Sequence, residues 1–84
     1  MSTTQENVEG LVREIVLGIV DTPDDAEISS EVDEDGGICV NVKVNPDEVG
    51  LIIGREGHII RSIRTLARAI CYNSGERVNV EVIE

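Results

Sequence analysis

Aromatic side chains are almost missing from this sequence. Its 84 residues include one Tyr and neither Phe nor Trp, and Val and Ile are the most frequent apolar residues. A buried core must therefore consist mainly of branched aliphatic side chains. RRM domains of the RNP type and stacking OB-fold surfaces hold nucleobases against aromatic rings, so the composition disfavours both classes of protein.

Basic residues are also scarce, with 7 Lys and Arg against 17 Asp and Glu and a formal net charge of −10. Such a chain is repelled on average by nucleic acids and anionic membranes. The charges are unevenly distributed, however, because residues 50–70 hold four Arg and a single Glu. The basic cluster of the chain lies in this segment, whereas residues 1–49 are strongly acidic.

The sequence has no apolar run near the ~18 residues that a membrane-spanning helix needs, and its start lacks the segments of a signal peptide. We therefore expect a cytoplasmic protein that has no membrane partner. Cys39 and Cys71 are the two cysteines and one His accompanies them, so neither a zinc site nor another cofactor is predicted. Both cysteines are expected to be free thiols, and the alternative is a redox-sensitive Cys39.

The length predicts one small domain over residues 1–84, with a core from about residue 4 to residue 84. A capping box of Thr3 and Glu6 precedes a segment with the apolar spacing of an amphipathic helix. Pro23 ends this helix, because proline and the residue before it disfavour helical backbone. The apolar positions of the helix are Val8, Leu11, Val12, Ile15, Val16, Ile19 and Val20.

Residues 26–33 alternate between apolar and polar side chains, as a half-buried strand does. The Asp-Gly and Gly-Gly pairs within residues 34–37 predict a tight hairpin turn. Residues 38–44 alternate again, so we expect a second strand that pairs antiparallel with the first. The side chains expected to face the core are Ala26, Ile28, Ser30, Val32, Ile38, Val40, Val42 and Val44.

Asn45 and Pro46 predict the start of a short helix, as its cap and its first residue. Gly54 and Gly57 interrupt this helix, a second helix extends from there to about Tyr72, and a last strand covers residues 78–82. The predicted fold class is α+β, with the order helix, strand, strand, helix, helix, strand.

Gly54, Arg55, Glu56 and Gly57 form a Gly-x-x-Gly loop between these two helices. Glycines let the chain turn sharply and let another backbone approach closely. The N–H groups at the start of the following helix, with its positive dipole end, can then face a phosphate. His58 is a further candidate donor to a phosphate, and the alternative is an ordinary exposed residue.

Three arginines, Arg61, Arg64 and Arg68, share about 60° of the circumference of the second helix. We expect their side chains to face solvent and their replacement to cost little stability, because they lie opposite the apolar face. A solubilising surface is the alternative to a phosphate-binding one. The residues expected to form that apolar face are Ile59, Ile60, Ile63, Leu66, Ala67 and Ile70.

Ser62 and Thr65 have no His or Asp partner at a suggestive position, so no nucleophilic site is predicted. The carboxylate clusters at residues 24–25 and 33–35 are typical of solvated turns rather than of acid–base or metal sites. We therefore expect a protein that is not an enzyme.

The segments Asp21-Thr22-Pro23-Asp24-Asp25, Ile52-Ile53-Gly54-Arg55-Glu56-Gly57, Ile63-Arg64-Thr65 and Val80-Glu81-Val82-Ile83 resemble the KH domain family, specifically the small stand-alone bacterial proteins of the KhpA type. The resemblance implies a type II KH fold with a three-stranded mixed sheet and three helices on one face. It also implies binding of single-stranded RNA, as a homodimer or with another KH protein, in an RNA chaperone or post-transcriptional role.

Carried over to this chain, the resemblance implies that Gly54, Arg55, Glu56 and Gly57 clamp the RNA backbone. It makes Ile52, Ile53 and Ile60 the candidate wall of an aliphatic groove for bases. KhpA-like loops commonly place a basic and a neutral residue between the glycines, whereas Glu56 is acidic. Its carboxylate either weakens binding or turns away, to pair with Arg55 or to cap the helix.

Two alternatives follow from the acidic composition. The first is a protein-interaction module that keeps the KH scaffold and binds a basic partner through its acidic half. The second is a ribosome-assembly factor that binds structured rRNA.

Overall fold

The fold is given by a computed structural model that describes residues 2–83, so Met1 and Glu84 of the expected domain lie outside the described residues. The expected order of helices and strands is confirmed. The elements are α1 (Thr3–Ile19), η1 (Pro23–Asp25), β1 (Glu27–Val32), β2 (Ile38–Lys43), η2 (Pro46–Glu48), α2 (Val49–Ile53), η3 (Arg55–Gly57), α3 (His58–Cys71) and β3 (Val78–Ile83), where η marks a 3-10 turn.

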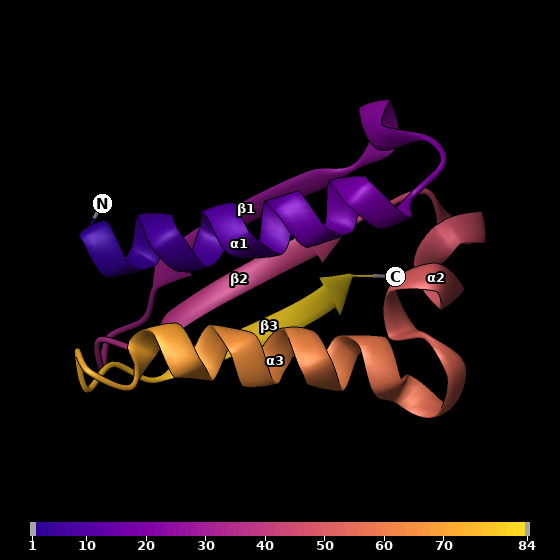
Figure 1. Ribbon diagram of the computed structural model, residues 1–84. Helices are drawn as coiled ribbons and strands as arrows, with labels where there is room; N and C mark the ends of the chain where they lie inside the picture. The colour runs from indigo at the N-terminus through magenta and orange to yellow at the C-terminus, as the bar shows by residue number, and fades with distance from the viewer. Residues whose placement is uncertain (1, 84) are drawn as a thin grey trace.

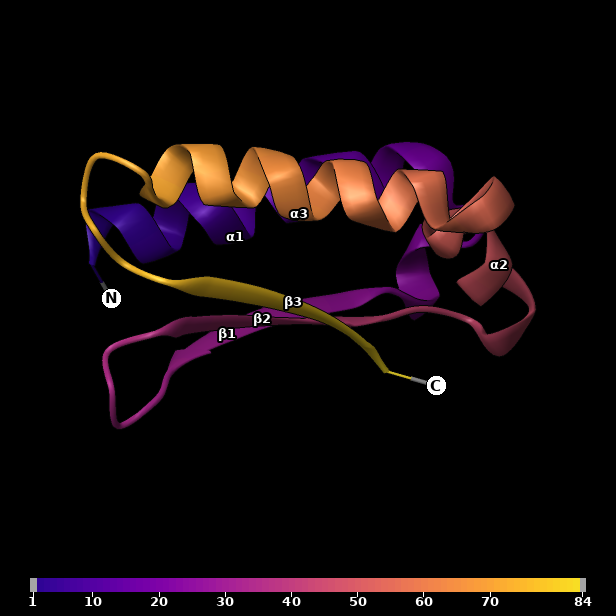
Figure 2. The ribbon, with the colours of Figure 1, turned by 90° about the horizontal axis from the view of Figure 1, so that it is seen from below.

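The three strands form a mixed sheet with β2 in the centre. β1 pairs antiparallel with β2, and β3 pairs parallel with it, so that Val40 lies between Ser30 and Val80. α1 and α3 lie side by side over one face of the sheet, and α2 lies beyond the ends of β2 and β3 (Figure 1). Figure 2 shows both long helices on the same side of the strands. The predicted α+β fold with a mixed sheet is confirmed.

The core between helices and sheet consists of branched aliphatic side chains, as the lack of aromatic residues requires. α1 buries one residue per turn with Val8, Val12 and Val16, and every second residue of β2 points toward the helices. Among residues 2–83, every fully buried side-chain nitrogen or oxygen has a hydrogen-bond partner. The fully or almost fully buried core side chains include Val8, Val12, Val16, Ile38, Val40, Val42, Ile52, Ile63, Ala67 and Val80.

Details of four expected features differ. Ser2, rather than Thr3, caps α1, since its Oγ accepts a hydrogen bond from the Gln5 N–H at 3.1 Å. Val32, expected inside, is 50% exposed at the end of β1. The connection between β1 and β2 covers the five residues 33–37, so it is longer than the expected tight turn. The Asp33 carboxylate closes this connection, because it accepts a hydrogen bond from the Gly37 N–H at 2.8 Å.

The fourth difference is a rotation of α3. Its buried face is formed by Ile60, Ile63, Ala67 and Cys71, whereas Leu66, expected in the core, is 48% exposed. Leu66 lies about 100° around the helix from Ala67, at the margin of that face. Relative to the expected orientation, α3 is rotated so that Arg64, on the other side of the buried face from Leu66, lies closer to the sheet.

Both edge strands have a backbone carbonyl bound by an arginine from the helix above. Arg13 of α1 donates to the Ile28 carbonyl of β1 at 2.8 Å, and Arg64 of α3 donates to the Val80 carbonyl of β3 at 3.1 and 3.2 Å. An exposed strand edge with unpaired carbonyls favours pairing with another chain. These arginines therefore protect the sheet edges while they tie each helix to its strand.

Glu48 fixes the start of α2 to the connection between α1 and β1. Its side chain is buried and accepts hydrogen bonds from the Thr22 hydroxyl, from the Asp21 N–H at 2.5 Å and from the Thr22 N–H at 3.2 Å. The Thr22 hydroxyl bond, aided by the backbone N–H groups of Asp21 and Thr22, lowers the pKa of Glu48 from its usual value of 4.5, although partial desolvation opposes this.

Because the pKa of Glu48 is lower in the folded protein than in the unfolded one, its contribution to stability is complete above about pH 5 and declines as the pH falls through 4.5 and below. We expect Glu48→Gln to lower the urea midpoint at neutral pH and to reduce the loss of stability between about pH 5 and pH 3. Asp47→Asn, at an exposed neighbouring carboxylate, is the control. Equal midpoints for the two variants would contradict this role.

Candidate nucleic-acid interface

The two glycines of the loop between α2 and α3 have different structural roles. Gly54 has a φ of 78°, and a Cβ atom there would lie 2.6 Å from the Ile59 side chain, so no other residue fits this turn. Gly57 has a φ of 77°, but a Cβ atom there would meet no atom within 4 Å. Gly54 therefore serves packing, whereas Gly57 leaves an open approach to the start of α3.

α3 begins without a side-chain cap, because its N-cap residue is Gly57. The first N–H groups of a helix have no carbonyl partner within the helix and carry its partial positive charge. The Gly57 N–H itself donates to the Gly54 carbonyl at 3.1 Å, which closes the loop. An anion that approaches from the open side of Gly57 would meet the positive end of a helix of 14 residues.

Glu56 is held in the loop by residues of α3. It is the one non-glycine residue with a positive φ among the described residues, at 55°. Arg61 donates to its carbonyl at 2.8 Å and contacts His58 Nδ1 at 3.2 Å, while the Glu56 carboxylate lies 3.5 Å from His58 Nε2. Because a guanidinium only donates, Nδ1 of His58 accepts and Nε2 carries the hydrogen. The Glu56 carboxylate therefore turns toward His58 instead of pairing with Arg55.

The arginines of this region fall into two pairs. Arg61 supports the loop, and Arg64 is half-buried against the edge of β3, which corrects the expectation that its side chain faces solvent. Arg55 and Arg68 are exposed, and neither forms a hydrogen bond or an ion pair with another part of residues 2–83. The prediction that all three arginines of the stripe face solvent is therefore wrong for Arg64, whereas Arg61 and Arg68 are exposed as expected.

Two of the three expected groove residues are in the core instead. Ile52 is fully buried and Ile60 is 5% exposed, because the short helix α2 and the first turn of α3 turn these side chains toward the sheet. Ile53 is half-buried beside the loop. The prediction for Ile52 and Ile60 as groove walls is thus corrected.

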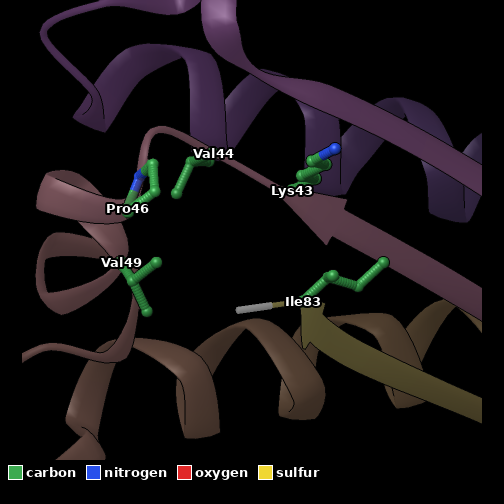
Figure 3. Close-up of a pocket in the computed structure, with 5 residues that line it drawn as sticks. All are labelled: Lys43, Val44, Pro46, Val49 and Ile83. Atoms are coloured by element: carbon green, nitrogen blue, oxygen red, sulfur yellow. The ribbon is translucent and has the colours of Figure 1, made fainter.

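An aliphatic cavity of about 290 Å³ lies next to α2, at a place where no site was expected from the sequence. Val49 points into it from α2, one helical turn before Ile53, and Ile83 borders it from the end of β3 (Figure 3). Lys43, the cross-strand partner of Ile83, supplies a basic group. Val49 and Ile53 are four residues apart, so they lie on the same side of α2 and form an aliphatic surface that continues from the cavity toward the loop. This spacing is the signal in the sequence that could have indicated the surface. The cavity is lined by Lys43, Val44, Pro46, Val49 and Ile83.

The cysteines show no sign of reactivity. Both are free, and Cys71 is buried in the core. Burial, and then the carboxylates of Glu31, Glu81 and Asp33, raise the pKa of the Cys39 thiol, so the reactive thiolate is disfavoured.

Within residues 2–83 no group of three His, Cys, Asp or Glu side chains could hold a metal ion. The helices of the same part of the chain are too short or too polar to cross a membrane.

Several curated bacterial proteins are similar to this chain in sequence over most of its length. The RNA-binding protein KhpA of Caldanaerobacter subterraneus subsp. tengcongensis is 38% identical over 73 residues, which cover 87% of this chain and 96% of that protein. The RNA-binding protein KhpA of Leifsonia xyli subsp. xyli is 39% identical over 70 residues, with coverages of 83% and 88%. That of Streptomyces coelicolor is 36% identical over 77 residues, or 92% of each chain.

An αββααβ unit with a mixed sheet and a Gly-x-x-Gly loop between two helices has the architecture of a KH domain. The family model described as "KhpA/KhpB, KH domain" matches residues 9–82, and the chain belongs to this family. A crystal structure of Aquifex aeolicus Era superimposes with a TM-score of 0.59 at 17% identity, over 98% of this chain and 31% of that chain. This likeness supports the fold alone, and our chain spans about a third of that chain's length.

The two kinds of arginine on α3 are distinguishable by their contribution to stability. We expect Arg64→Ala to lower the free energy of unfolding by about 1 kcal/mol, since a charged group loses its hydrogen bonds to the Val80 carbonyl. Arg68→Ala is the matched control, and its cost should stay within about 0.5 kcal/mol. Urea unfolding of both variants measures the difference, and equal costs would contradict the assignment of Arg64 to the sheet edge.

Proposed function

We propose that this protein binds single-stranded RNA, with the Gly54–Gly57 loop on the RNA backbone. The proposal rests on three features together: an α3 N-terminus without a side-chain cap, the open approach beside Gly57, and the guanidinium of Arg55, which has no partner within residues 2–83. A phosphate at this point would accept hydrogen bonds from backbone N–H groups and neutralise one arginine. Its curated relatives carry the name RNA-binding protein KhpA, which supports the same function for this chain.

Bases of the bound strand are proposed to occupy the aliphatic surface along α2. Val49, Ile53 and Ile83 offer apolar contact, and Lys43 at the rim of the cavity offers a second phosphate contact. A KH domain clamps about four nucleotides without an aromatic platform in this groove, which suits a chain with one aromatic residue. This surface replaces Ile52 and Ile60 in the expected groove.

The biological role proposed is that of an RNA chaperone or post-transcriptional regulator in the cytoplasm, without enzymatic activity. Two free cysteines suit a reducing compartment. A loop that contacts two or three phosphates binds weakly, so a second site on a partner would raise the affinity through effective concentration. We therefore propose a homodimer or a complex with another KH protein as the working form.

One observation favours a second candidate function, an acidic protein-interaction module. The sheet face opposite the long helices carries the exposed carboxylates of Glu27, Glu31 and Glu81, with Lys43 as its one base among the described residues. A basic partner would fit this face and leave the loop free. A role in ribosome assembly is the other alternative, and stronger binding to structured RNA than to single strands would favour it.

The loop assignment is tested by replacing Arg55 and Glu56 together. We expect Arg55→Asp/Glu56→Asp to abolish binding to a fluorescent single-stranded RNA pool in an anisotropy assay, because a carboxylate then stands where Arg55 meets phosphate. The circular dichroism spectrum should not change, since both side chains are exposed. Thr3→Glu/Asn7→Glu adds the same two negative charges at the exposed N-terminal part of α1 and is the control. Wild-type affinity in the loop variant would refute the assignment.

Glu56 provides a test in the opposite direction. Glu56→Lys replaces one repulsion from phosphate by one attraction, each worth about 0.7 kcal/mol at about 6 Å in water, so RNA binding should tighten by about tenfold. The slope of log affinity against log salt should steepen by about 0.7 from a wild-type value near −1.4 to −2.1. Glu56→Gln removes the charge alone and should give an intermediate affinity. If Glu56→Lys instead binds RNA more weakly, the contact between the Glu56 carboxylate and His58 is needed to hold the loop in its binding conformation.

A further inference from the structure

Tyr72 is the single aromatic residue of the chain, and its side chain is 84% exposed. An aromatic side chain can bury about 150–250 Å², yet this one lies outside the aliphatic core. It follows directly after the last residue of α3, at the end of the helix remote from the Gly-x-x-Gly loop. The protein therefore presents its one stacking surface to solvent.

Tyr72 continues a line of exposed side chains along α3. Arg61, Thr65, Arg68 and Tyr72 follow one another at spacings of four, three and four residues, which keeps them within about 60° of the helix circumference. All four are exposed. Arg61 and Tyr72 are 11 residues apart, so the line is about 17 Å long at the helical rise of 1.5 Å per residue.

A second cavity, of about 430 Å³, lies at the Tyr72 end of this line. It is bordered by Arg68, whose guanidinium has no partner within residues 2–83, and by Arg77, which lies 3.7 Å from the Asp35 carboxylate in an exposed ion pair. Glu76 is the one acidic residue of the lining, and Asp35 already pairs with Arg77, so Arg68 is the cation of this cavity that has no partner within residues 2–83. The lining residues are Arg68, Cys71, Tyr72, Gly75, Glu76, Arg77 and Val78.

We propose that Tyr72 and Arg68 form a second contact for single-stranded nucleic acid, beyond the nucleotides held by the loop. A base stacks on the Tyr72 ring, and Arg68 binds the neighbouring phosphate. Aromatic stacking combined with a basic path is how proteins hold single strands without sequence preference. The guanidinium of Arg68 favours a nucleic acid over a protein segment, because it has no partner within residues 2–83 and can neutralise a phosphate beside the ring of Tyr72. This inference rests on the proposed RNA-binding function.

The single tyrosine makes the contact directly observable. Protein labelled with 3-fluorotyrosine gives one ¹⁹F resonance, from residue 72 alone. The probes are single-stranded oligouridylates of about four nucleotides, which occupy the loop, and of about twelve, which extend along α3. We expect the long probe to shift the ¹⁹F resonance and the short probe to leave it nearly unchanged.

Affinity measurements on two variants complete the test. Tyr72→Ala should weaken binding of the long probe about fivefold and leave binding of the short probe unchanged, because stacking on an exposed ring lies at the lower end of its usual range. Tyr72→Phe keeps the stacking face and should bind like the wild type. Circular dichroism checks that both variants fold.

Each other outcome separates the two proposals. If the long probe binds but neither the ¹⁹F resonance nor the Tyr72→Ala affinity changes, the second contact is wrong and the loop assignment stands. If neither probe binds, the proposed RNA-binding function fails as well. If Tyr72→Ala alters self-association in size-exclusion chromatography while RNA affinity is unchanged, this surface is a protein interface and the proposal is overturned.

Discussion

The packing of Gly54 against Ile59 is the constraint on which the candidate interface depends. The chain must reverse between α2 and α3 with a φ of 78°, and a Cβ atom would lie 2.6 Å from the Ile59 side chain. This close packing seats Ile60 and Ile63 in the core and thereby orients α3. The N-terminus of α3, the arginines along it and Tyr72 at its far end all take their positions from this turn.

The arginines differ in whether another part of the protein already binds their guanidinium groups. A net charge of −10 repels phosphate polymers on average, while the guanidinium groups of Arg55 and Arg68 have no hydrogen-bond or ion-pair partner within residues 2–83. Arg64 and Arg13 hold the edges of the sheet instead. Counting arginines therefore overstates the charge available to RNA, and the hydrogen bonds of each guanidinium decide its role.

The fold was largely predictable from the sequence because its signals are local: a period of two along β1 and β2, a helical period in α1, and glycines at 54 and 57. Such patterns do not fix how far a helix rotates on its sheet, so the core position assigned to Leu66 and the solvent position assigned to Arg64 were wrong. The same limit applies to the groove, where Ile52 and Ile53 are adjacent in sequence but only Ile52 is fully buried. The cavity beside Val49 is bordered by Ile83 at the end of β3, and local patterns cannot place that residue beside α2 because the two are distant in sequence.

Mapping the backbone amides by ¹H–¹⁵N NMR during titration with a short single-stranded RNA tests the central claim most directly. We expect the largest shifts at residues 54–61, which form the loop and the start of α3, together with Val49 and Ile53 on α2. The amides of Glu27, Glu31 and Glu81 on the open sheet face should shift little. Shifts confined to Glu27, Glu31, Glu81 and their neighbours on that face, with none at residues 54–61, or an unchanged spectrum at saturating RNA, would contradict the assignment of the Gly54–Gly57 loop as the RNA-binding site.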